Sequence, residues 1–357
     1  ITINNPINTA GITSVTLGSG NFVAGSTAGD SIVSGGDNNT LVGTNAGTAV
    51  TTGDFNTALG SQALAQTNTA GQNTAIGGYA MYYNTTGANN TAVGLQALLD
   101  NTTGDNNVSV GYNSLTNNTT GAENVAVGYG SLGANTTAEN NVAVGREALT
   151  TNTTGASNVA LGRNALYANT TASNNTAVGY VALTANTTGV ENTAVGMRAL
   201  TTNTTGDDNA AVGKDALRYN TTGINNTATG VAALRDNTTA SYNSAMGMYA
   251  LAANTTGANN TATGYASLAT NTTGGANSAV GYNSLAANTT GNHNNSLGYL
   301  ALYYNTTGSQ NTAIGGTALY ANTTGASNTA VGYASLGANT TGTGNIAVGL
   351  TAGDTTT

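Results

Sequence analysis

Side chains that could perform catalysis or hold a metal are few in this 357-residue sequence and lie apart from one another. The single histidine, His293, has no acid or base beside it at a spacing that supports proton transfer or metal binding. Acidic pairs such as Asp207–Asp208 do not recur at a fixed interval, as calcium-binding repeats require. Gly35–Gly36 lacks the Gly-Lys-Ser/Thr that completes a phosphate loop. The sequence therefore predicts no catalytic residue, no cofactor and no metal, and indicates a protein that is not an enzyme.

Tyrosine is the residue type whose spacing suggests binding. Tyr265, Tyr282 and Tyr299 recur every 17 residues, and Tyr303 and Tyr320 have the same spacing. If 17 residues make one turn of a coil, each set forms an aromatic stripe of the kind that contacts sugars or proteins. The alternative is that the stacked rings only reinforce the coils. We predict a binding surface at these five tyrosines.

A second recurring pattern is Asn-Thr-Thr, which repeats from Asn84 to Asn339 in 16 consecutive units. Each copy is formally an N-glycosylation sequon. An asparagine turn followed by a ladder of threonines explains the same repetition without any glycan. Both interpretations are open at the level of sequence.

The composition excludes several classes of protein. Only 6% of the residues are charged, and the six Lys and Arg residues are spread along a chain of net charge −8. Phosphate binding needs clustered basic side chains, so we expect no nucleic-acid partner. No apolar run approaches the roughly 20 residues of a membrane-spanning helix, and no cysteine is present to form disulfides. Because the chain opens with Ile1, we expect a processed or excerpted piece whose export signal lies outside it.

The positions of all these residues follow from a tandem repeat. Asn39–Gly43 returns every 17 residues as far as Asn345–Gly349, which makes 19 copies without an insertion or deletion. We number the repeat so that Asn39 and its equivalents occupy slot 1. Slot 1 is Asn and slot 5 is Gly in every copy, slot 8 is Ala or Ser, and slot 9 is Leu in 16 copies. Slots 6, 7, 10, 11, 16 and 17 vary and hold all 17 tyrosines, so we expect these slots to face solvent.

The repeat predicts an all-β fold. Its length matches no helical period, and units rich in Gly, Asn and Thr favour short strands joined by turns. We predict a parallel β-solenoid or β-roll of about 19 coils over residues 39–357, with residues 1–38 as an N-terminal cap that includes Val15, Leu17 and Phe22. The slot 1 asparagines should form a hydrogen-bonded ladder. The slot 5 glycines should have positive φ or mark a close approach of two backbones.

Strand alternation places slots 2 and 4 on one face and the small slot 3 on the other. We expect one Val-like side chain, the Leu of slot 9 and two alanines to supply a thin core in each coil. Ordering 17 residues costs on the order of 20 kcal/mol, so even with the ladder hydrogen bonds the stability of a lone rod stays near zero. We therefore predict a homotrimer in which a second backbone approaches slots 3 and 8, as at Ala92 and Ala97. The alternative is that these small residues fit a tight corner of their own chain.

The units resemble a known family of repeats. Asn175–Leu183, followed by Asn186–Gly189, looks like the repeats of bacteriophage tail-fibre proteins, and the Ala-Val-Gly core is more loosely similar to the head repeats of trimeric autotransporter adhesins. The phage-type pattern covers residues 39–353. The resemblance implies an extracellular homotrimeric fibre on a virion or cell surface that contacts a host glycan or protein. It transfers no catalytic residue, and no receptor-binding tip, membrane anchor or C-terminal chaperone is recognisable.

Three functions are compatible with these observations. The first is a fibre shaft or adhesin-type stalk. The second is a subunit of an extracellular filament, since open solenoid ends expose strand edges. The third is ice binding by regular threonine ranks, although slot 2 varies among Thr, Val, Ser and Ala.

Overall fold

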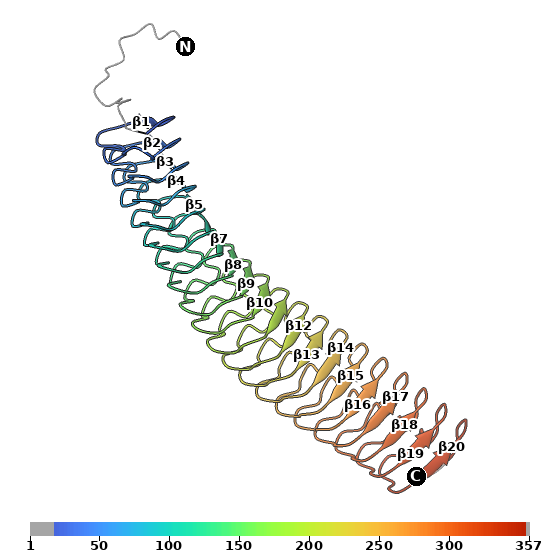
Figure 1. Cartoon of the computed structure of the whole chain (residues 1–357). Coiled ribbons are helices and arrows are strands. Elements are labelled where there is room, and N and C mark those ends of the chain that lie inside the picture. Colours follow the sequence, from blue (N-terminus) through green and yellow to red (C-terminus); the bar gives the residue numbers. More distant parts are fainter. Residues whose placement is uncertain (1–17, 355–357) are drawn as a thin grey trace, which may run out of the picture. The chain divides into compact units, whose positions relative to one another are not determined.

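The computed structural model describes residues 18–354, so Val15 and Leu17 of the predicted cap lie outside the described residues. The chain forms two compact units; unit 1 ends at Asn174 and unit 2 begins at Asn175. Both units consist of three-residue strands joined by turns (Figure 1), and residues 18–354 contain no helix. No segment of this described part therefore has the helical length and hydropathy needed to cross a membrane.

Each coil contributes one strand, formed by slots 2 to 4. Unit 1 contains β1 (Phe22–Ala24), β2 (Thr40–Val42), β3 (Thr57–Leu59), β4 (Thr74–Ile76), β5 (Thr91–Val93), β6 (Val108–Val110), β7 (Val125–Val127), β8 (Val142–Val144) and β9 (Val159–Leu161). Unit 2 contains β10 (Thr176–Val178), β11 (Thr193–Val195), β12 (Ala210–Val212), β13 (Thr227–Thr229), β14 (Ser244–Met246), β15 (Thr261–Thr263), β16 (Ser278–Val280), β17 (Asn295–Leu297), β18 (Thr312–Ile314), β19 (Thr329–Val331) and β20 (Ile346–Val348).

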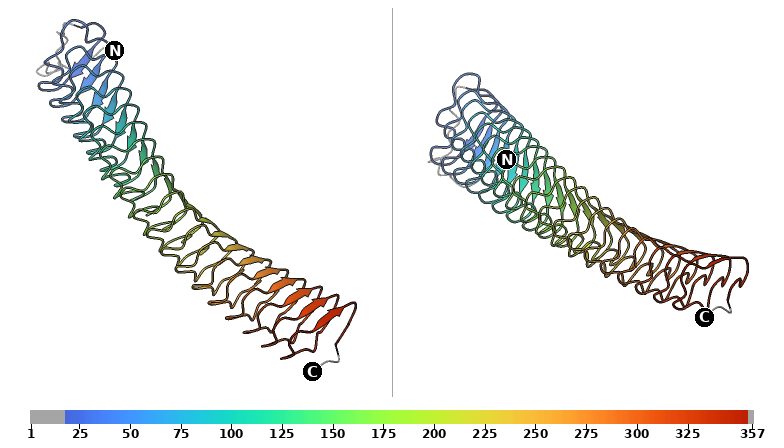
Figure 2. Two further views of the ribbon diagram at one scale, coloured as in Figure 1. Left: turned by 60° about the horizontal axis from the view of Figure 1, so that its bottom comes forward. Right: turned by 90° about the horizontal axis from the view of Figure 1, so that it is seen from below.

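Within each unit, every strand pairs in parallel with the strand of the next coil. Thr193 pairs with Ala210, for example, so the register advances by the 17 residues of the repeat. Figure 2 shows the strands of successive coils stacked along one side of each unit. The predicted all-β parallel β-solenoid of about 19 coils is confirmed. Strand β1 also joins the sheet, where Phe22 pairs with Thr40 across an 18-residue step. The role of residues 1–38 as an N-terminal cap stays a prediction.

The core is formed by slots 3, 8 and 9. The predicted separation of slots 2 and 4 from slot 3 is confirmed, but the prediction that slot 4 belongs to the core was wrong. Ala92 and Ala97 are fully buried inside their own coil, as is the slot 9 Leu98. The larger side chains of slot 4 point outward instead; Leu161 is 45% exposed. Slots 3 and 8 are therefore closed to a second chain, and the alternative of a tight corner within one chain is correct.

Two substitutions within the repeat show why the small residues are inside. Ser109 in slot 3 and Ser114 in slot 8 hydrogen-bond across the interior at 2.6 Å, so these two slots face each other at close range. In the first copy, slot 3 is Leu41 and slot 9 is Gly47, where an added Cβ would lie 2.7 Å from the Leu41 side chain. One coil interior therefore holds one leucine and small side chains, and a branched residue in slot 4 has no room there.

The backbone conformation of the coil depends on slots 5 and 9. Gly179 has a φ of 139°, and a Cβ at this position would lie 2.6 Å from the carbonyl oxygen of Gly196 in the next coil. Both predicted roles of the slot 5 glycine are confirmed. Leu183 in slot 9 has a φ of 51°, in the left-handed region. That conformation costs about 1–2 kcal/mol for a non-glycine residue, and burying the leucine side chain contributes about 1.5–3 kcal/mol in return.

Two asparagine columns complete the interior. The slot 1 ladder is confirmed: the backbone N–H of Asn192 donates to Oδ1 of Asn175 at 3.0 Å. Slot 12 forms a second ladder, in which Nδ2 of Asn203 donates to Oδ1 of Asn186 at 2.9 Å. Within one coil the two columns share an acceptor, because Asn192 and Asn203 both donate to the carbonyl of Gly206. The amides therefore link each coil to its neighbour and brace it across its own width.

Candidate functional site

The predicted slot 6 stripe forms an ordered stack of rings in unit 2. The ring centroids of Tyr265 and Tyr282 are 5.2 Å apart with planes inclined by 12°, and those of Tyr282 and Tyr299 are 5.5 Å apart with an inclination of 16°. All three side chains are exposed. Parallel stacking covers most ring faces with neighbouring rings, so this stripe offers ring edges and hydroxyl groups along its length.

The second predicted stripe is a three-ring cluster. Tyr303 and Tyr320 stack at 5.8 Å with an inclination of 16°, and Tyr304 meets both rings edge-on. Hydrogen bonding to Tyr304 raises the pKa of Tyr320 above its ordinary value. The structure therefore brings the five predicted tyrosines into two aromatic clusters in one unit, and their role in binding stays a prediction.

The Asn-Thr-Thr sequons have a structural explanation. The asparagine is buried, as at Asn203, and its amide nitrogen donates two hydrogen bonds. The first threonine of the triplet is tied to the next coil: Oγ1 of Thr187 donates to the carbonyl of Thr204 at 3.0 Å. The second threonine is exposed, as at Thr205. A folded coil cannot carry a glycan on this asparagine, because the nitrogen that would bear it lies inside the ladder.

The charged groups of the described chain act locally. His293 is exposed, and residues 18–354 contain no cluster of three or more His, Cys, Asp or Glu side chains able to hold a metal. Asp215 is the most buried carboxylate and bridges two arginines, Arg198 at 2.8 Å and Arg218 at 3.5 Å. This arrangement neutralises a charge at the coil surface.

The comparisons with known proteins give no assignment. No family model matches the sequence, and no curated protein matches it. The geometry of the chain itself must therefore support any proposal.

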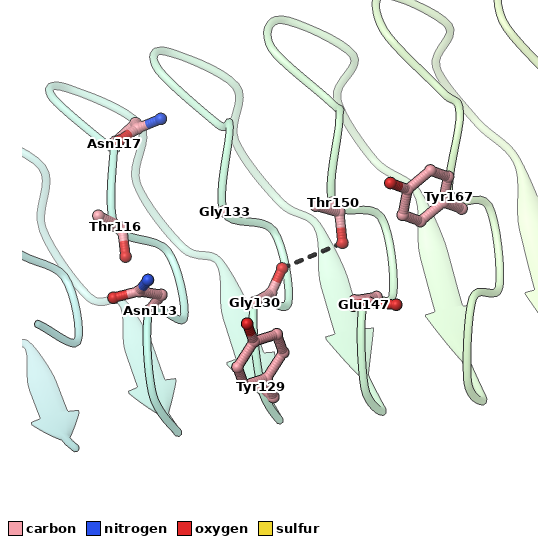
Figure 3. A pocket seen from close by; sticks show the side chains of 9 residues that line it. All are labelled: Asn113, Thr116, Asn117, Tyr129, Gly130, Gly133, Glu147, Thr150 and Tyr167. Atoms are coloured by element: carbon pink, nitrogen blue, oxygen red, sulfur yellow. Dashed lines mark hydrogen bonds between the residues drawn. The ribbon is translucent and has the colours of Figure 1, made fainter. Parts of the chain in front are cut away.

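Sequence reasoning missed a pocket of about 290 Å³ in unit 1 (Figure 3). Figure 3 shows that its lining comes from successive coils, with a hydrogen bond of 3.1 Å from Oγ1 of Thr150 to the carbonyl of Gly130 at the centre. The lining residues are Asn113, Thr116, Asn117, Tyr129, Gly130, Gly133, Glu147, Thr150 and Tyr167. The signal that could have found it is the coil 124–140, which has glycine in two outward slots, 7 and 10.

A second missed feature is the slot 4 column on the outward face of the strands, which is almost entirely apolar and carries no charge. Slot 4 is apolar in 17 of the 19 copies and threonine in the other two. In unit 1 this column is Val42, Leu59, Ile76, Val93, Val110, Val127, Val144 and Leu161; in unit 2 it is Val178, Val195, Val212, Thr229, Met246, Thr263, Val280, Leu297, Ile314, Val331 and Val348. Several of these side chains are about half exposed, including Leu297 and Met246. An exposed apolar column of this kind, beside the largely polar slot 2 column, is typical of an interaction face.

Proposed function

We propose that this chain is the shaft of a surface fibre or adhesin-type stalk and that it has no enzymatic role. The observation that carries the proposal is the use of the side chains in the described coils. The constant polar groups, such as Asn192 and Asn203, hydrogen-bond to neighbouring coils or brace their own coil. The constant polar groups of the repeat therefore serve to stack one coil on the next, and a spacer needs this regular stacking. The resemblance to phage tail-fibre repeats supports the same function and an extracellular location on a virion or cell surface.

The shaft that we propose is a homotrimer packed through the slot 4 face. A half-exposed side chain such as Leu297 contributes roughly 1 kcal/mol when its remaining surface is buried, and one chain carries this column through coil after coil. The column contains no charge that would oppose contact between copies. Packing copies through this face supplies the burial that a single thin coil lacks. The interface thus differs from our prediction from sequence, in which slots 3 and 8 met the partner.

Attachment to a host glycan or protein is the second part of the proposal, and the slot 6 stripe is its candidate surface. Its test is the replacement of Tyr265, Tyr282 and Tyr299 together by Ser. Binding of the fluorescently labelled chain to cells and glycan arrays should weaken, while its circular dichroism is unchanged. The matched control replaces the outward Thr205 and Thr222 of slot 14 by Ser. Undiminished binding by the tyrosine variant would show that the stripe only supports the stack and that the chain acts as a spacer.

Ice binding is a second candidate because one observation favours it. The slot 14 threonine is present in 18 consecutive copies from Thr52 to Thr341, and all 18 are exposed. They recur at the coil spacing of about 4.8 Å. The slot 13 threonines beside them are tied to the next coil, so the surface presents one fully exposed rank. Thermal hysteresis that is lost when Thr205 and Thr222 are replaced by Lys would favour ice binding over the shaft, and absence of hysteresis would reject it.

A further inference from the structure

We propose that the pocket in unit 1 binds a single pyranose ring of a carbohydrate. The site lies outside the predicted tyrosine stripes, which are in unit 2, and the inference does not rest on the fibre role. Its volume of about 290 Å³ is at the lower end of small-molecule sites, which span about 300–1,000 Å³. A space of that size takes one ring-sized group rather than an extended chain.

The pocket exists because one coil lacks two outward side chains. Slot 7 is Asn113, Gly130 and Glu147 in three successive coils, so the middle position contributes no side chain. Slot 10 follows the same pattern, with Gly133 between Thr116 and Thr150. The side chains that flank the gap are two coil steps apart, or roughly 9–10 Å. A Cβ at Gly130 would meet no atom closer than 4.0 Å, so the notch is open space and not a site of backbone contact.

Two aromatic rings border the notch. Tyr129, in slot 6, is exposed, and its ring stacks on Tyr112 at 5.5 Å. Tyr167 belongs to slot 10 of a later coil and is also exposed. Figure 3 shows the Tyr129 ring on the glycine coil itself and Tyr167 two coils further along, with the coil of Glu147 and Thr150 between them. Because Tyr129 stacks on Tyr112 and also lies under Arg146, the exposed ring of Tyr167 is the one that suits the apolar C–H face of a pyranose.

The polar groups of the pocket match hydroxyl groups. Asn113 contributes an amide side chain to the lining. Asn117 adds an amide with both donor and acceptor, and Glu147 adds a carboxylate. Mixed donors and acceptors of this kind are complementary to a polyol.

The charge of the pocket argues against a cationic ligand. Glu147 is the only ionised group in the lining, and its carboxylate lies 3.3 Å from the guanidinium of Arg146. Arg146 also lies over the Tyr129 ring, 5.5 Å from its centroid. The carboxylate and one aromatic face are therefore already engaged by a cation of the protein itself. A neutral sugar can bind while Arg146 stays on the Glu147 carboxylate and over the Tyr129 ring.

The repeat supplies variants that fill the notch without disturbing the fold. Gly130 has a φ of 61°, and Gln62 and Gln96 occupy the same slot at 61° and 58°. Gly130→Gln therefore places a side chain in the gap at a backbone conformation that glutamine already adopts in this chain. Tyr167→Thr removes one ring and introduces the residue that Thr150 provides in the same slot. The matched control is Ala334→Gln, which makes the same slot 7 change in unit 2, where φ is 53°.

Saturation-transfer NMR tests the proposal on the full chain, with the methyl pyranosides of glucose, galactose, mannose and N-acetylglucosamine as probes. We expect transfer to at least one of them at millimolar concentration. Its affinity should fall about tenfold or more in Gly130→Gln and Tyr167→Thr, and should be unchanged in Ala334→Gln. Melting curves identify any variant that fails to fold. If Gly130→Gln does not fold, Tyr167→Thr alone tests the proposal.

Three results would overturn the proposal. One is no transfer from the wild-type chain to any probe. Another is equal transfer in the wild type and in the folded notch variants. The last is a loss in Ala334→Gln as large as that in Gly130→Gln, because the sugar would then bind elsewhere on the coils.

Discussion

The slot 12 ladder gives the sharpest prediction about stability. Asn203 is fully buried, and its side chain makes three hydrogen bonds. Nδ2 donates to Oδ1 of Asn186 and to the carbonyl of Gly206, both at 2.9 Å, and Oδ1 accepts from Nδ2 of Asn220 at 2.8 Å. Asn203→Ala removes all three bonds and places a methyl group where two coils are joined.

The magnitude follows from the partners that remain. Each lost bond costs about 1 kcal/mol net, which gives about 3 kcal/mol for three bonds. The carbonyl of Gly206 keeps the bond from Asn192, and Nδ2 of Asn220 keeps its bond to Gly223, so two of the three partners are still bonded. We therefore expect a loss of about 3–4 kcal/mol. Thr205→Ala, two residues away on the exposed face, should cost less than about 0.5 kcal/mol.

Hydrogen exchange measured by mass spectrometry is the suitable assay, because repeat proteins open locally and need not unfold in one step. The amide of Thr187 donates to the carbonyl of Thr204, and the amide of Thr204 donates to that of Thr221, so both report opening beside the substituted position. Peptides over residues 186–223 should exchange faster in Asn203→Ala and at the wild-type rate in Thr205→Ala. Unchanged exchange in Asn203→Ala, or equal acceleration in both variants, would refute the role given to the ladder.

Three further predictions concern other slots. Gly196→Val should destabilise unit 2 by about 3 kcal/mol or more in thermal unfolding, because its φ is 136° and a Cβ would lie 2.5 Å from the next coil's carbonyl, whereas the exposed Lys214→Ala should change little. Burial raises the pKa of Asp100 above its ordinary 3.8, so the folded chain favours the protonated carboxyl. This contribution to stability is fully present below pH 3.8 and is lost as the pH rises through the raised pKa of the folded state. Asp100→Asn should therefore raise the melting temperature near pH 7 and leave it almost unchanged near pH 3. Replacing Val195 and Val212 of slot 4 by Lys should reduce the mass measured by light scattering to that of one chain, and an unchanged mass would exclude this face as the interface.

The sequence predicted the coil because its constraints are periodic. An asparagine every 17 residues can form a ladder only if successive copies are stacked, and a constant glycine indicates a conformation or a contact that no other residue allows. Alternation of side chains along a strand separates two faces but does not say which one is inside. Placing the Val-like slot 4 in the interior was wrong, because the alanines, the two asparagine columns and one leucine such as Leu98 already fill the coil. Positive φ at that leucine could not be predicted either, since it is a compromise between backbone cost and burial.

The pocket was harder to foresee than the stripes. Tyr265 and Tyr282 are noticed because aromatic residues recur, and the structure does stack them. The pocket depends on the absence of side chains at Gly130 and Gly133. Because slots 7 and 10 vary in residue type, a glycine there does not stand out in the sequence. Its walls also come from several coils, so no single repeat contains the site. Aligning the outward slots of neighbouring coils, rather than the constant slots, is the analysis that identifies such a gap.

The mass of the wild-type chain in solution tests the central claim most directly. The claim is that copies associate through the slot 4 face into a homotrimeric shaft. Light scattering coupled to gel filtration, at micromolar concentration, should give three times the chain mass of 34.9 kDa. A single species of 34.9 kDa, folded by circular dichroism, would contradict the account, because the outward apolar column would then be stable in water without a partner.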